Sequence, residues 1–199
     1  MADPASFTDR ENWTGGFYEL SLEIGDHDDA RLERALTALW QAAGITGPYA
    51  DQRREPADQQ EVPATPASLH EFGHLYGVAE PLGTAVVCGC YVSRFDDAED
   101  WLNLYLPLGA LANTDRRIGA FPFGPEGGPQ SLAWRTRLDG WLATVAARVF
   151  DEVGFRVGLI GFELDYVTAA ELAGEVPDQR WNGYLLPADG RLRHFPANR

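Results

Sequence analysis

The strongest constraint on the fold is a run of apolar residues at helical spacing between Ser131 and Gly154. Its apolar positions are Trp134, Leu138, Trp141, Leu142, Val145 and Val149. Residues three and four apart share one side of a helix, so these side chains form one long apolar face. Ser131 supplies an N-cap and Gly154 a stop. Such a face must be covered, so the fold has to contain other elements that pack against it.

A strand is predicted at residues 17–24, where apolar and polar residues alternate. The apolar set is Tyr18, Leu20, Leu22 and Ile24, and the polar set is Glu19, Ser21 and Glu23. Successive side chains of a strand point to opposite sides, so the pattern predicts a half-buried strand whose polar set faces solvent. A second long helix should follow, because residues 26–29 offer N-caps and Gly44 offers a stop.

The other segments rich in β-formers are residues 85–95, 101–106 and 155–164. A closing hairpin is expected at residues 184–195, with its turn at residues 188–190. Together with the two helices, this order predicts an α+β fold: a single, mainly antiparallel sheet with two long helices packed on one face.

We place one domain at residues 13–199. Residues 1–12 are polar and should form a flexible N-terminus. Residues 49–66 are rich in Asp, Gln, Arg, Glu and Pro, with little to bury, and should form an exposed loop or linker.

Charge narrows the classes of partner. The 199 residues include 30 acidic and 16 basic ones, for a formal net charge of −14. Nucleic acids and anionic membranes are bound through clustered Lys and Arg, so neither is expected as a partner. All basic residues are arginine, which excludes a Schiff-base lysine. The sequence shows neither a secretory signal nor an apolar run of about 20 residues, so a cytoplasmic location is expected.

One short motif indicates a specific chemistry: His70-Glu71-Phe72-Gly73-His74. On a helix, positions i and i+4 share one side, so the two imidazoles could hold one zinc ion. Thr65-Pro66 would start that helix. The segment resembles the active helix of zincin metallopeptidases. The resemblance implies that His70 and His74 are zinc ligands and that Glu71 is the general base acting on a zinc-bound water.

The match extends a little beyond the motif. Gly77 lies three residues after His74, where the metzincin subset has its helix-ending glycine, and Glu80 stands at the position of that family's third ligand. The only methionine is Met1, so the methionine-containing turn that supports the metal in metzincins is absent.

Two other interpretations compete with the zinc helix. In one, residues 75–79 form a strand that turns into residues 84–95, and His70 and His74 would lie about 13 Å apart at its entrance. In the other, Cys88 and Cys90 join the two histidines in a closed structural zinc site. The simplest role for the cysteines is that of small core residues on a central strand.

The sequence therefore favours a protein that acts by binding, without catalysis or cofactor, with a basic protein or peptide as partner because the net charge would attract it. An inhibitor or neutralising protein would be one form of it. The alternative is a zinc-dependent, peptidase-like hydrolase with ligands His70, His74 and Glu80 and general base Glu71. A third option is a small-molecule enzyme or carrier. Oligomeric state is left open.

Overall fold

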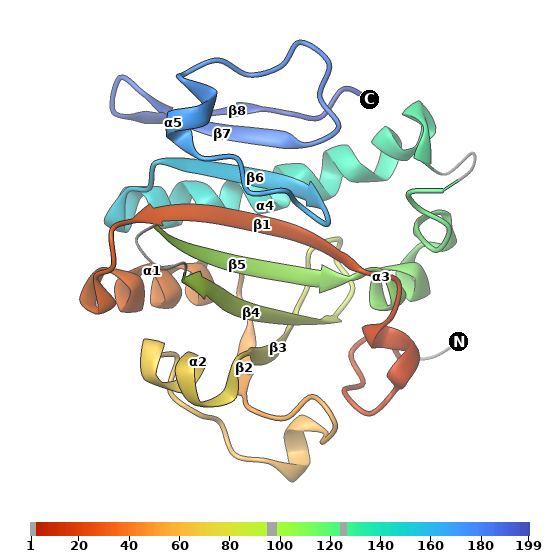
Figure 1. Cartoon of the computed structure of the whole chain (residues 1–199). Helices are drawn as coiled ribbons and strands as arrows, with labels where there is room; N and C mark the ends of the chain where they lie inside the picture. The colour runs from red at the N-terminus through yellow and green to blue at the C-terminus, as the bar shows by residue number, and fades with distance from the viewer. Residues whose placement is uncertain (1–2, 95–98, 124–126) are drawn as a thin grey trace.

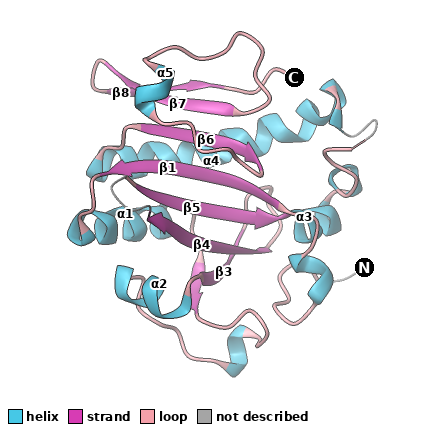
Figure 2. Ribbon diagram, viewed as in Figure 1, coloured by secondary structure: helices cyan, strands magenta, loops and turns pink. Residues whose placement is uncertain are grey.

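The computed structural model describes residues 3–94, 99–123 and 127–199; Phe95, the end of one predicted strand, lies outside these ranges. Within them, eight strands form one sheet in the order β2-β3-β4-β5-β1-β6-β7-β8, and each neighbouring pair is antiparallel (Figure 1 and Figure 2). The strands are β1 Phe17–Gly25, β2 Thr46–Tyr49, β3 Leu75–Ala79, β4 Val86–Arg94, β5 Asp100–Pro107, β6 Val157–Phe162, β7 Gly183–Ala188 and β8 Arg191–Phe195. The predicted α+β fold with a single antiparallel sheet is confirmed.

The α-helices are α1 Asp29–Ala42, α2 Pro66–Phe72, α3 Leu108–Thr114, α4 Leu132–Val153 and α5 Ala169–Leu172. Short 3-10 turns occur at η1 Arg10–Trp13, η2 Pro56–Asp58, η3 Arg116–Ile118 and η5 Pro129–Ser131. In the described ranges, none of the helices combines the length and the apolar character needed to cross a bilayer.

Helices α1 and α4 contact each other and cover one face of the sheet, here called the back face, which is the far side in Figure 1. The apolar set of β1 points to this face, where Leu20 and Leu22 share a core with Leu36 of α1 and Leu142 of α4. Each of these leucines is fully buried, which contributes about 2 kcal/mol to stability. The two long helices lie on one face, as the apolar spacing predicts.

The opposite face, here called the front face, is turned toward the viewer in Figure 1. The segment 164–176, which includes α5, covers its β6–β7 half through a second apolar cluster. The members of that cluster include Trp101, Val157, Leu159, Leu164, Tyr166, Ala169, Leu172 and Leu186. Strand β1 is therefore buried on both faces. The prediction that Glu19, Ser21 and Glu23 face solvent is wrong, because β1 is the central strand between β5 and β6.

The two segments predicted to be flexible or exposed are fastened to each other. Phe7 is buried, and the Glu55 carboxylate accepts hydrogen bonds from Ser6 Oγ at 2.7 Å, from Thr8 Oγ1 at 2.6 Å and from the Phe7 N–H at 3.1 Å. Partial burial opposes ionisation of Glu55, but the bonds from Thr8 and Ser6 outweigh it and lower its pKa to about 2. A polar anchor thus orders segments that have few apolar residues.

Candidate functional site

The helix required by the zinc prediction ends too early. Helix α2 stops at Phe72, Gly73 follows with φ of 76°, and His74 lies outside the helix, just before β3. A positive φ ends the i to i+4 geometry that would place both imidazoles on one side. His70 lines a cavity of about 240 Å³ with Leu69 and Arg94, whereas Nδ1 of His74 lies 3.0 Å from the hydroxyl oxygen of Tyr105. The two histidines have different surroundings.

The predicted general base, Glu71, and the other predicted ligands also lie apart. Glu71 and Glu80 are exposed, and Cys88 and Cys90 are fully buried in the back-face core, where burial raises the pKa of both thiols. Strands β3 and β4 pair as the competing hairpin interpretation predicts. No set of three or more His, Cys, Asp and Glu side chains is placed to hold a metal ion within the described ranges. As the structure places them, His70, His74 and Glu80 do not form one ligand set among the described residues.

A different group of polar and aromatic side chains meets on the front face. We call it the front-face cluster, and its members are Glu19, Ser21, His74, Tyr91, Ser93, Asn103, Tyr105 and Tyr166. The sheet register brings them together, because Tyr105 of β5 lies opposite Glu19 of β1, and Asn103 lies opposite both Ser21 and Tyr91. Tyr166 comes from the segment that follows β6 and reaches over the sheet.

Hydroxyl groups join most of the cluster. The Tyr166 hydroxyl lies 3.2 Å from the Tyr91 hydroxyl and 3.0 Å from Ser93 Oγ, and it donates to Asn103 Oδ1 at 3.4 Å. The ring of Tyr91 packs against the rings of His74 and Tyr105, with centroids 5.1 and 5.9 Å apart. These contacts fix the aromatic side chains relative to each other and to the sheet.

Two glycines leave space for side chains of the front-face cluster. A Cβ at Gly89 would lie 2.3 Å from the Tyr105 hydroxyl oxygen, so only glycine lets this ring lie flat across β4. A Cβ at Gly161, which lies opposite Glu19 on β6, would lie 2.4 Å from Asn182 Oδ1. The sheet is therefore bare of side chains on the β6 side of Glu19, where Asn182 comes close, and the Tyr105 ring on its β5 side extends over Gly89.

Glu19 is the unusual member of the cluster. It is 5% exposed, and its carboxylate has no hydrogen bond or ion pair in the described part of the chain. Burial, together with the nearby Glu163 carboxylate, raises the pKa of Glu19 to about 7. Ser21, two residues along the same face of β1, is fully buried, and its Oγ also has no partner there. Buried polar groups left unsatisfied each cost about 1–3 kcal/mol and call for an explanation.

Burial also shifts the pKa of two other members of the cluster, His74 and Tyr91. Burial lowers the pKa of His74, so its imidazole is uncharged. Burial, and then the hydrogen bond with Tyr166, raises the pKa of Tyr91, which stays protonated. Glu163, exposed at the rim, accepts a hydrogen bond from the Phe17 N–H at 3.0 Å. The front-face cluster thus surrounds one buried carboxyl with neutral hydroxyl groups and aromatic rings.

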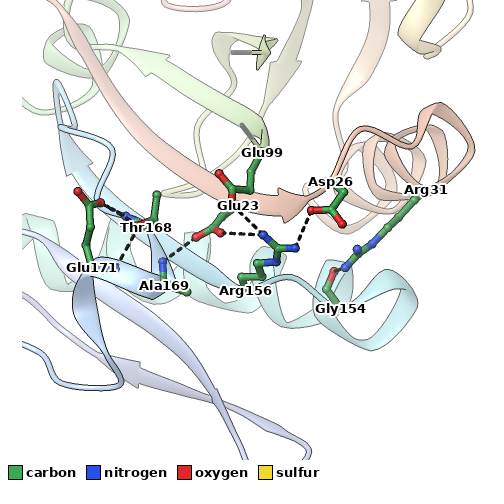
Figure 3. Close-up of polar contacts among 9 residues, drawn as sticks. All are labelled: Glu23, Asp26, Arg31, Glu99, Gly154, Arg156, Thr168, Ala169 and Glu171. Carbon is green, nitrogen blue, oxygen red and sulfur yellow. Dashed lines mark hydrogen bonds and ion pairs between the residues drawn. The ribbon is translucent and has the colours of Figure 1, made fainter. Parts of the chain in front are cut away.

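Glu23, at the other end of β1, is fully partnered (Figure 3). Its carboxylate accepts a hydrogen bond from the Ala169 N–H at 2.7 Å and lies 3.7 Å from Arg156. Arg156 also pairs with Asp26 at 2.8 Å and Glu99 at 2.9 Å. Since Ala169 is the first residue of α5, this network ties α5 to the centre of the sheet. Glu23 therefore has a structural role.

Comparison with known proteins adds nothing to this description. No family model, no curated protein and no solved structure matches the chain. Function therefore has to be argued from the chemistry of the site.

Proposed function

We propose that this protein acts by binding a basic protein or peptide and that the front-face cluster receives a cationic group of that partner. The single observation that carries the proposal is the buried Glu19 carboxyl, which has no partner among the described residues. A cation bound there would supply the missing partner, and charge-assisted hydrogen bonds contribute about 1.5–3 kcal/mol each.

The proposal is supported by the way in which the arginines are paired within the chain. Many of them are held by carboxylates or carbonyl oxygens of the same chain: Arg31, Arg53, Arg94, Arg117, Arg135, Arg156 and Arg180. Exposed carboxylates such as Glu33, Glu61 and Asp165 have no ion pair in the described ranges. The excess of 30 acidic over 16 basic residues is thus available at the surface to attract a basic partner.

The proposal is tested by measuring the fluorescence anisotropy of labelled basic peptides during titration with the protein at low ionic strength. We expect saturable binding that weakens steeply as salt is added, because exposed charges are screened. A peptide of the same length without basic residues is the control and should not bind. Equal binding of the two peptides, or no binding of either, would contradict the proposal.

A second function, proton-transfer catalysis on a small molecule, is favoured by one observation: a carboxyl with a pKa of about 7 suits a general acid or base at neutral pH. The hydroxyls of Tyr91 and Tyr166 would then be hydrogen-bond donors to the substrate. The test is incorporation of deuterium from heavy water into simple ketones and keto acids, followed by NMR. Glu19→Gln should abolish it. Absence of any exchange with the native protein leaves binding as the function.

A further inference from the structure

We infer that the front-face cluster binds the guanidinium group of an arginine side chain in preference to the ammonium group of a lysine. The inference rests on the proposed function, because it names which group of a basic partner the cluster takes. Its basis is two buried side chains on one face of β1, Glu19 and Ser21, that have no hydrogen-bond partner in the part of the chain that the structure describes.

Hydration favours the guanidinium. Glu19 is 5% exposed, so a cation that reaches its carboxylate has to leave most of its water behind. An ammonium is a compact, strongly hydrated charge, whereas a guanidinium spreads its charge over a plane and is more weakly hydrated. The desolvation penalty at a buried carboxylate is therefore smaller for arginine.

The aromatic rings beside Glu19 favour a planar cation. Phe17 precedes Glu19 by two residues on the same face of β1, and its ring centroid lies 4.4 Å from that of Tyr105. Tyr91 packs against Tyr105 in turn, at 5.9 Å. A guanidinium can stack on such rings while it bonds a carboxylate at its edge.

The acceptors around Glu19 match a group with many donors. A guanidinium carries five N–H donors and an ammonium three. Besides the two Glu19 oxygens, Ser21 Oγ is buried without a partner among the described residues, and Asn182 Oδ1 lies over Gly161, directly opposite Glu19. Arginine can satisfy more of these acceptors at once than lysine can.

Glu163 adds a second carboxylate at the exposed rim. Its φ of 44° is unusual for a residue with a side chain, and its Oε1 is held by the Phe17 N–H at 3.0 Å. Gly16 makes room for this carboxylate, because a Cβ at Gly16 would lie 2.6 Å from it. The chain therefore holds two carboxylates near each other, one exposed and one buried, and a single cation would reduce their repulsion.

The test is isothermal titration calorimetry with two peptides that differ only in having arginine or lysine at every basic position. For the native protein we expect about tenfold tighter binding of the arginine peptide. Glu19→Gln should remove this preference and leave weak, salt-sensitive binding of both peptides. Glu80→Gln makes the same charge change at an exposed turn and should retain the preference.

Location is tested separately by NMR, with the arginine peptide added to ¹⁵N-labelled protein. The amide signals of Gly161 and Gly89, which flank the cluster, should shift during the titration. As a variant at the rim, Glu163→Gln should reduce the preference for arginine while the buried Glu19 side chain is kept, so the test does not depend on how well Glu19→Gln folds.

The outcomes separate the two proposals. Equal affinity for both peptides, unchanged by Glu19→Gln, would overturn the arginine inference while the binding function stands. Absence of binding by either peptide would overturn both. A preference for arginine that persists in Glu19→Gln would place the arginine site elsewhere and overturn the inference.

Discussion

The two ends of strand β1 each carry a buried carboxylate, and the two carboxylates differ in their partners. Glu19 and Glu23 lie on one face of one strand, four residues apart, and expose 5% and 1% of their surface. Glu23 has a backbone N–H and a guanidinium as partners, which come from α5 and from the residue before β6 (Figure 3). Among the described residues Glu19 has no hydrogen bond or ion pair, and the nearby charge that acts on it is the carboxylate of Glu163.

This difference shows that the role of a buried carboxylate depends on its partners and not on its burial alone. At the Glu23 end the carboxylate has a hydrogen bond and a guanidinium from the same chain, although burial still raises its pKa, and these contacts hold α5 in place. At the Glu19 end the charge is left unbalanced, next to aromatic rings that would suit a ligand. Buried charges are retained in proteins when something neutralises them, so the missing partner of Glu19 is expected from outside the described chain.

The largest effect should appear on replacing the unbalanced carboxyl. The pKa of Glu19 is raised from its usual 4.5 to about 7, so the folded protein binds more protons than the unfolded chain across this range. Its contribution to stability is therefore present below pH 4.5 and lost as pH rises through 7, by roughly 3 kcal/mol in all. Glu19→Gln should remove this loss and be more stable than the native protein at pH 8. Urea unfolding at several pH values measures it, and parallel stability curves for the two proteins would contradict it.

A somewhat smaller effect, of opposite sign, is expected at the Glu23 end. Arg156→Met should lower the free energy of unfolding by about 2 kcal/mol, because Glu23 keeps its buried carboxylate and loses its cation. The Arg156 side chain is 41% exposed, so solvent screening keeps the effect below that of a fully buried pair. Arg53→Met, at an exposed ion pair with Asp51, is the control and should change stability by less than about 0.5 kcal/mol. Similar losses in both variants would remove the distinction.

Tyr166→Phe should have a moderate effect on stability. It should act at the Glu19 end of β1 and leave the Glu23 end unchanged. It removes the hydroxyl that contacts Tyr91, Ser93 and Asn103, at a cost of about 1 kcal/mol, and leaves the ring against Trp101. Because α5 is held by the Glu23 network, its hydrogen-exchange protection should stay as in the native protein. Loss of protection in α5 would show that the cluster also serves as a structural anchor.

The smallest effect is expected at an exposed carboxylate. Glu71→Gln should change stability by less than about 0.5 kcal/mol, since Glu71 lies on the outside of α2. Elemental analysis should give the same zinc content for the native protein, Glu71→Gln and His74→Ala. One zinc per chain in the native protein, lost in His74→Ala, would restore the motif as a metal site.

Helices and strands whose apolar residues recur at a regular spacing could be predicted from the sequence. The apolar stripe of α4 and its stop at Gly154, the alternation in β1, and the β7–β8 turn all depend on neighbours within a few residues. The pairing of distant strands could not be predicted in the same way. That β1 lies between β5 and β6 depends on contacts at least 75 residues apart along the chain, and this pairing buries Glu19 and Glu23.

The candidate site is only weakly indicated by the sequence. Glu163 and Asp165 beside an apolar strand are unexpected carboxylates, and an ion pair with Arg156 is the simplest interpretation of the sequence. In the structure Arg156 pairs with Glu23, Asp26 and Glu99 instead. For the zinc motif, the warning lies in the motif itself, because Gly73 is a residue type that commonly ends helices.

The position of β1 also has a consequence for synthesis on the ribosome. It is made before both of its neighbours, which are completed only at residues 107 and 162. Until β5 is complete, a strand with an apolar side and two open edges has no native neighbour, and such segments are prone to aggregate. One edge of β1 stays open until β6 follows. The centre of this sheet therefore closes only after residue 162 has been made.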